Sequence, residues 1–186
     1  MTKIKQIKIG FVESDKKTWI YACSSVTLIQ DNKTNILVDT GGKGFAKEII
    51  SNLKKEKLTP QEINYVINTH NHLDHIWNNA YFENAKFISS AGILDKKFTW
   101  GHLPIKIGEN IEIIPTPGHS KDSCSVIVKT EKGVYAIVGD LVHGDIKHIP
   151  SFEKDKDTII KNKAKILAIA DYIVPGHDKM IEVKRI

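Results

Sequence analysis

The chain has 186 residues, of which 41% are hydrophobic, and a formal net charge of +5. This length and composition are typical of one globular domain, so residues 1–186 are predicted to fold as a single unit. No apolar run is long enough to span a membrane, and the N-terminus alternates polar and apolar residues without the continuous apolar core of a secretory signal. We therefore expect a cytoplasmic protein that does not enter membranes.

The positive charge comes almost entirely from lysine, because Arg185 is the sole arginine. The lysines are interleaved with acids, as in 54–57 and 153–157, which is typical of solvated helix faces. A protein that binds nucleic acid more often has clustered arginines and aromatic residues that stack on bases. The charge permits an anionic substrate. We expect a small-molecule substrate, with nucleic acid left open as a partner. The sequence indicates no oligomeric state.

Hydrophobic periodicity predicts strands and helices in alternation along the chain. Strands are expected at 4–12, 19–30, 34–39, 64–69, 85–89, 111–116, 124–130 and 134–139, with a last strand ending at Val174. Helices are expected at 44–57 and 154–170, with a short helical piece after residue 75 and a linker over 92–106. Strands with intervening helices imply sheets covered by helices, so periodicity alone predicts a mixed α/β fold.

Cys23 and Cys124 are the only cysteines, and each lies next to a strand-like run. A single pair without a secretory signal is more often two small buried thiols than a disulfide, although the sequence leaves both open. Cys124 follows His119 closely enough to approach a site around that histidine, but we expect it to fill space in the sheet.

The segment Thr69–His75 places four metal-capable side chains within six residues, directly after a strand-like stretch. In an extended segment His70 and His72 point to the same side, because side chains alternate with a period of two. Asp74 and His75, at the turn beyond, can face a second ion. Imidazole and carboxylate suit Zn, Fe or Mn, so this segment is one half of a metal site. The alternative is a polar loop with exposed histidines.

Three further ligand-type residues each follow an apolar run at a turn. His119 and His177 stand in Pro-Gly-His triplets, and Asp140 stands in a Gly-Asp pair. Glycine lets the backbone turn tightly where a side chain must be aimed, and proline restricts the approach. A lone histidine after Pro-Gly is usually just a turn residue. Three such positions together with the histidine motif predict the other half of the metal site.

In these motifs, from Asp39-Thr40-Gly41 to Pro175-Gly176-His177, the chain resembles the metallo-β-lactamase superfamily of hydrolases over nearly its whole length. In size it is similar to the short single-domain metallo-β-lactamase-domain-containing proteins. The resemblance implies a four-layer αββα sandwich with the ligands on loops along one edge. It also implies one metal bound by His70, His72 and His119, a second bound by Asp74, His75 and His177, and Asp140 as the bridge between them.

Two further roles follow from the resemblance and from metal chemistry. Asp74 is predicted to bind metal and also to orient the metal-bound hydroxide or pass on its proton, so it is the expected catalytic residue. Asp39 is a predicted outer partner that accepts an imidazole N–H and fixes a histidine tautomer. The alternative for Asp39 is an acid that caps the turn before Gly41 and Gly42. The expected cofactors are two divalent metal ions, with zinc first and iron or manganese as alternatives.

The predicted activity is hydrolysis by a hydroxide that bridges two metals, on an ester, thioester, lactone or phosphodiester that the sequence leaves unassigned. The alternatives are a phosphodiesterase or ribonuclease acting on RNA, and a mononuclear iron enzyme that oxidises sulfur compounds. The chain ends soon after His177, so we expect no helical domain like that of glyoxalase-II-type thioesterases. Specificity is expected from the loops 13–19, 92–106 and 141–153. In the last of these, His143 and His148 are either leaving-group acids or solvated.

Overall fold

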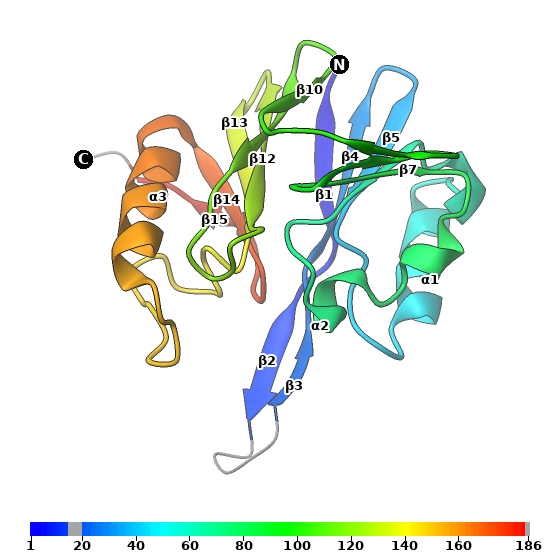
Figure 1. Ribbon diagram of the computed structural model, residues 1–186. Helices are drawn as coiled ribbons and strands as arrows, with labels where there is room; N and C mark the ends of the chain where they lie inside the picture. Colours follow the sequence, from blue (N-terminus) through cyan, green and yellow to red (C-terminus); the bar gives the residue numbers. More distant parts are fainter. Residues whose placement is uncertain (15–19, 185–186) are drawn as a thin grey trace.

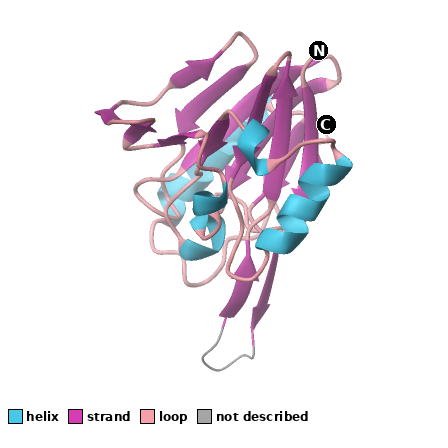
Figure 2. Ribbon diagram, turned by 90° about the vertical axis from the view of Figure 1, so that its right-hand side faces the viewer, coloured by secondary structure: helices cyan, strands magenta, loops and turns pink. Residues whose placement is uncertain are grey.

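The structure is a computed structural model that describes residues 1–14 and 20–184 (Figure 1). A seven-stranded sheet runs in the order β1 (Lys3–Lys8), β4 (Val26–Asp31), β5 (Thr34–Val38), β6 (Tyr65–Ile67), β7 (Lys86–Ser89), β8 (Gly92–Leu94) and β9 (Phe98–Trp100). A six-stranded sheet runs in the order β10 (Ile105–Ile107), β11 (Ile111–Pro115), β12 (Cys124–Thr130), β13 (Gly133–Gly139), β14 (Tyr172–Pro175) and β15 (Ile181–Glu182). A separate ribbon of β2 (Phe11–Ser14) and β3 (Ile20–Cys23) projects beyond both sheets, as Figures 1 and 2 show.

Three hydrophobic clusters arrange these elements in four layers. The largest cluster lies between the sheets and joins Ile36 and Val38 of β5 to Val126 and Val128 of β12. A second cluster packs α1 (Ala46–Lys55) on the outer face of the seven-stranded sheet, and a third packs α3 (Lys156–Ile169) on the outer face of the six-stranded sheet. This order of helix, sheet, sheet and helix confirms the predicted αββα sandwich.

The strands in the middle of each sheet are apolar on both faces because both faces are covered. In β5, Ile36 and Val38 face the space between the sheets, while Leu37 joins the cluster around α1. In β13, Ile137 faces inward and Val138 joins the cluster around α3. Side chains that alternate with a period of two thus serve two cores at once.

The helices match the expected positions and have local reasons for their bounds. In α1, Ile49 and Leu53 are buried one turn apart, which gives the helix its apolar stripe. In α3, the side chain of Asp155 accepts a hydrogen bond from the backbone N–H of Thr158 at 3.2 Å, so it caps the first turn. The expected helical piece after the histidine motif is α2 (Leu73–Ile76), which begins inside the motif. Among the described residues, no helix is long and apolar enough to cross a membrane.

Three expectations about the strands were wrong in detail. The single strand expected at 4–12 is two strands, β1 and β2, and the one expected at 19–30 divides into β3 and β4. The first of these breaks falls at Gly10, where an added Cβ would lie 2.4 Å from the carbonyl oxygen of Gly176, so the approach of that distant backbone requires glycine there. The linker expected at 92–106 contains β8 and β9 and the start of β10. Its residues Phe98 and Trp100 are exposed, so this hairpin lacks the alternation of a half-buried strand.

Both cysteines are free and buried, which confirms the prediction of two thiols and no disulfide. The thiol of Cys124 donates to the backbone carbonyl of Asn68 at 3.4 Å. Burial raises the pKa of each thiol, so both remain protonated and inert.

Candidate metal centre

Strand direction brings the predicted ligands to one edge of the sandwich. β5 and β6 are parallel in one sheet, and β13 and β14 are parallel in the other. Asp140 directly follows β13, the His70 motif follows β6, and Gly176-His177 follows β14. Because the carboxyl ends of parallel strands lie on the same side of a sheet, these residues meet although they are far apart in the sequence.

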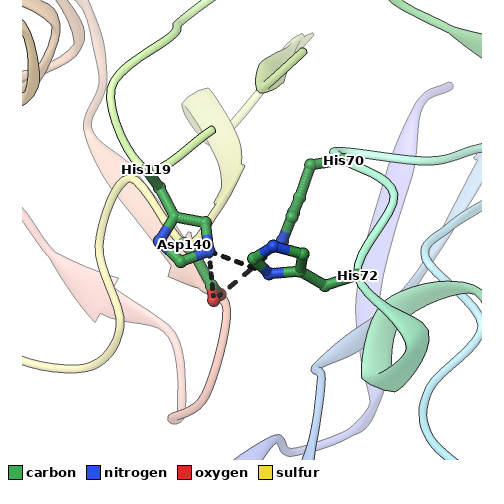
Figure 3. Close-up of side chains that lie close together, drawn as sticks. All are labelled: His70, His72, His119 and Asp140. Atoms are coloured by element: carbon green, nitrogen blue, oxygen red, sulfur yellow. Dashed lines mark hydrogen bonds and ion pairs between the residues drawn. The ribbon is translucent and has the colours of Figure 1, made fainter. Parts of the chain in front are cut away.

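The first ligand group, here called group A, consists of His70, His72 and His119. The ligand atoms of group A and of Asp140 all lie within 4.8 Å of one another. His119 Nε2 lies 3.0 Å from His72 Nδ1 and 3.4 Å from Asp140 Oδ2, and His70 Nε2 lies 4.0 Å from the same oxygen. Figure 3 shows the two histidines of the motif on one loop, facing His119 and Asp140 from the other side.

The second ligand group, group B, consists of Asp74, His75 and His177, whose ligand atoms are also within 4.8 Å of one another. His75 Nε2 and His177 Nε2 each lie 3.2 Å from Asp140 Oδ1. His177 Nε2 lies 3.4 Å from Asp74 Oδ2. The two oxygens of Asp140 therefore face different groups, Oδ2 toward group A and Oδ1 toward group B.

The polar atoms in the middle of the cluster lack hydrogen-bond partners in the described structure. His70 Nε2, His75 Nε2 and Asp140 Oδ1 are buried and unpaired. An unpaired buried polar atom costs about 1–3 kcal/mol, so three in one place call for an explanation. His75 Nε2 and Asp140 Oδ1 lie 3.2 Å apart without forming a hydrogen bond, and the ligand atoms within each group lie within 4.8 Å of one another. Ligands of a cation are arranged in this way. The residues present thus fit divalent metal binding.

Burial and neighbouring charges determine the protonation of the cluster. Burial lowers the pKa of His70 to about 2, and the nearby His75 acts in the same direction, so His70 is neutral. Burial also acts to lower the pKa of His75, but Asp140 and Asp39 outweigh it and hold that pKa well above its usual value. Burial acts to raise the pKa of Asp140, but His75 and His177 outweigh it and hold that pKa well below its usual range. Asp140 is therefore an anion suited to a position between two cations.

Asp39 lies where an outer partner was predicted. Its Oδ2 is 2.8 Å from His75 Nδ1, which leaves His75 Nε2 turned toward Asp140. The backbone N–H and the hydroxyl of Thr69 also donate to the Asp39 carboxylate, each at 2.8 Å. These contacts, and none to the amides of Gly41 or Gly42 in the described structure, are the contacts of a residue that fixes a histidine tautomer. Asp39 has a positive φ of 58°, which is uncommon for a residue with a side chain.

Two glycines of the motifs are required by space. At Gly176 an added Cβ would lie 2.0 Å from Asp140 Oδ1, and at Gly139 it would lie 2.5 Å from the hydroxyl of Thr69. Gly139 also has φ +51°, a conformation that side chains disfavour. Gly176 and Gly139 therefore allow close packing around Asp140, and they also allow the chain to turn.

Two residues of the 141–153 loop also belong to the site. The sequence pattern predicts that Glu153 lies on a solvated helix face, but it is buried, with Oε1 2.6 Å from His119 Nδ1 and 2.8 Å from His143 Nε2. Sequence reasoning missed Glu153 because its neighbours Lys154 and Asp155 are exposed and nothing local distinguishes it. The structure distinguishes the two histidines whose role the sequence left undecided. His143 Nδ1 lies 3.6 Å from Asp140 Oδ2, whereas His148 is exposed.

Comparisons with known proteins identify the family of this chain. A model of the metallo-β-lactamase superfamily matches residues 24–109. A Xenopus laevis protein named metallo-β-lactamase domain-containing protein 1 is 32% identical over 166 residues, which are 84% of this chain and 71% of that protein. A Methanocaldococcus jannaschii protein named "Probable metallo-hydrolase" is 36% identical over 150 residues, 78% of this chain and 72% of the other. The chain belongs to the metallo-β-lactamase superfamily.

Solved structures confirm the superfamily fold. The crystal structure of a Thermotoga maritima protein described as a "putative metallo-beta-lactamase" has a TM-score of 0.78 at 20% identity and covers 97% of this chain and 99% of its own. An N-acyl homoserine lactone hydrolase has a TM-score of 0.67 at 18% identity, with 87% and 84% covered. At such identities the likeness shows the fold alone. Membership of the superfamily confirms the prediction of a metal-dependent hydrolase at the level of the family, and the histidine and aspartate cluster supplies ligands for divalent metal.

Proposed function

We propose that this superfamily member is a dinuclear hydrolase, with zinc as the metal. Group A holds one ion, group B holds the other, and Asp140 bridges them. The observation that carries this proposal is the division of the Asp140 carboxylate, with Oδ2 facing the histidines of group A and Oδ1 facing His75 and His177. A single ion would leave one group without a cation, and with it a buried histidine, His70 or His75.

When both ions are bound, they supply a hydroxide nucleophile at neutral pH and polarise the oxygen of the bond to be cleaved. The residues of the chain hold and orient these components. Asp74 is the most exposed carboxylate of the cluster, with 27% of its side chain accessible, and its Oδ2 faces His177 at 3.4 Å. It therefore lies between group B and the solvent, where a carboxylate can orient the hydroxide and take its proton.

A groove beside Asp74 supports a small-molecule substrate. It has a volume of about 480 Å³ and is lined by Ile20, Tyr21, Ala22, Lys43, Leu73, Asp74 and Trp77. Its walls are mostly apolar, and the ammonium of Lys43 lies 5.5 Å from the centre of the Trp77 ring. This combination suits a substrate with an apolar group and an anionic group. A thioester, lactone, ester or phosphodiester of that kind would fit, and the lactone hydrolase of the same fold has its product bound at its catalytic metal centre.

The test combines metal analysis with a substrate panel. We expect close to two transition-metal ions per chain after reconstitution. The loaded protein should then be assayed on p-nitrophenyl acetate, a glutathione thioester, an acyl lactone, a β-lactam and bis-p-nitrophenyl phosphate. We expect turnover that rises with pH to a plateau as the bridging water ionises near pH ~7. A metal content that stays near one would contradict the dinuclear proposal and favour the mononuclear iron enzyme. Phosphodiester cleavage that weakens steeply as salt rises would favour the nuclease alternative.

A further inference from the structure

His143 and Glu153 belong to neither ligand group, yet they complete the wall of group A. A single carboxylate oxygen, Glu153 Oε1, lies 2.6 Å from His119 Nδ1 and 2.8 Å from His143 Nε2. Because an ionised carboxylate only accepts hydrogen bonds, both rings must carry a proton on the nitrogen that faces Glu153. This leaves Nε2 of His119 bare for metal and turns Nδ1 of His143 toward Asp140, 3.6 Å away.

The backbone around His143 is as firmly held as its ring. Its carbonyl accepts a hydrogen bond from the N–H of His177 at 2.8 Å, and the adjacent Val142 carbonyl accepts from Gly176 at 2.9 Å. The His143 ring stacks over the His177 ring with centroids 5.9 Å apart and meets the His119 ring edge-on at 5.2 Å. His143 therefore lies over the Asp140 bridge, in contact with one histidine of each ligand group.

We propose that His143 is a substrate-contacting residue and that Glu153 is the positioning residue for both His143 and the ligand His119. Nδ1 of His143 accepts a hydrogen bond from a hydroxyl or amide N–H of the substrate beside the cleaved bond. Glu153 fixes both tautomers through one oxygen and so couples metal binding to substrate binding. This inference rests on the proposed dinuclear hydrolase and assigns a further contact within that same site.

Two substitutions of His143 separate its two nitrogens. In His143→Gln the side-chain amide nitrogen can take the place of Nε2 and keep the contact with Glu153, while nothing replaces Nδ1. In His143→Asn the amide can take the place of Nδ1 but no longer reaches Glu153. The exposed His148, on the same loop, provides the matched control His148→Gln. Metal affinity is measured by competition with a chelator, and inorganic phosphate, which keeps a hydroxyl at neutral pH, is titrated calorimetrically into the metal-loaded protein.

For His143→Gln we expect unchanged metal affinity and phosphate binding weakened about tenfold, the effect of one lost hydrogen bond. His143→Asn should retain more phosphate affinity than His143→Gln, and His148→Gln should match the wild type. On any substrate that the wild type hydrolyses, the His143→Gln variant should show the same loss in kcat/KM. Wild-type phosphate affinity and turnover in His143→Gln would overturn the substrate contact.

Glu153→Ala tests the positioning role. We expect its metal affinity to fall roughly 10- to 100-fold, as is usual when the partner of a metal-binding histidine is removed, with phosphate binding impaired even at saturating metal. Glu153→Gln keeps an oxygen that can accept from both rings, so it should recover part of the metal affinity. Equal metal affinity in wild type and Glu153→Ala would overturn the role of Glu153. Because metal affinity is measured without turnover, this failure is distinct from a failure of the proposed hydrolase activity, which would be seen in the wild type.

Discussion

Group A and group B use similar ligands but are supported very differently. In group B, Nδ1 of His75 meets the Asp39 carboxylate, and Nδ1 of His177 lies 3.1 and 3.2 Å from the backbone carbonyl oxygens of Phe11 and Cys23. The backbone of group B is tied as well, because the carbonyl of His75 accepts from the N–H of Thr40 at 2.7 Å. Group B is thus held in place, without a bound ion, by the seven-stranded sheet and by the ribbon of β2 and β3.

Group A is less firmly held at one member, His72, although Glu153 holds His119 from outside the group. His72 is exposed, and the only hydrogen-bonding distance of its ring in the described part of the chain is the 3.0 Å to His119, between two atoms that would both bind metal. Its loop is tied through Asn71, whose amide donates to Asp122 at 2.6 Å near the surface. Preorganised ligands bind an ion without an ordering cost, whereas His72 must be ordered by the ion itself. We therefore expect group B to bind its ion more tightly than group A.

The largest effect should come from removing what the two groups share. Asp140→Ala takes one ligand from each ion and leaves His75 and His177 without their anion, so we expect loss of both ions and turnover at background. Metal analysis after gel filtration and assay of the reconstituted protein measure this. Asp157→Ala, at an exposed acid on α3, is the control. Full metal content in Asp140→Ala would show that Asp140 does not bridge the groups.

His72→Ala should separate the two groups. The variant loses a ligand only from group A, so we expect one ion per chain to remain bound with nearly wild-type affinity, and hydrolysis to be lost. Stepwise chelator competition on wild type and variant gives both affinities. If the remaining ion binds with the weaker of the two wild-type affinities, then group A, not group B, holds the tighter ion, and the order inferred above is wrong.

Asp39→Asn should act mainly on group B, because Asp39 contacts His75 directly and reaches His70 of group A only through the Thr69 hydroxyl. The amide is similar in size to the acid, but it removes the charge behind His75, so we expect the tighter ion to bind roughly 10- to 100-fold less well. Binding of the weaker ion, in group A, should fall less. Comparable losses in both steps would mean that Asp39 supports the site as a whole. In either case the loss of bound metal lowers thermal stability, because an ion at 100 times its Kd stabilises the fold by about 2.7 kcal/mol.

The smallest expected effect is that of pH on group B. The pKa of His75 is raised in the metal-free protein, so at neutral pH the ring carries a proton that an ion must displace. Metal affinity in group B should therefore rise with pH, by up to about tenfold per unit for one displaced proton, and level off above the raised pKa. His70, with its pKa near 2, should release no proton over the same range. Calorimetry in buffers of different ionisation enthalpy counts the protons, and no proton release at pH 7 would contradict this assignment.

The sequence by itself determined the chemistry of the ligands and most of the elements. A spacing of two between His70 and His72, and turns of Pro-Gly-His and Gly-Asp, are local features, because strand periodicity and glycine conformations act over a few residues. The same local rules located the long strands and both long helices. They failed where a strand has an exposed face, as at Phe98–Trp100, and where a distant backbone approaches, as at Gly10.

Only the tertiary structure decided how the ligands divide and what supports them. That Asp140 turns one oxygen to each group depends on the meeting of two sheets, and no neighbour in the sequence encodes it. Glu153 lies 34 residues from His119 in a charged run, and its burial follows from how the loop before α3 packs against the second sheet. Distances between ligands and the partners of their second nitrogens are contacts between distant segments, so they exist only after the chain has folded.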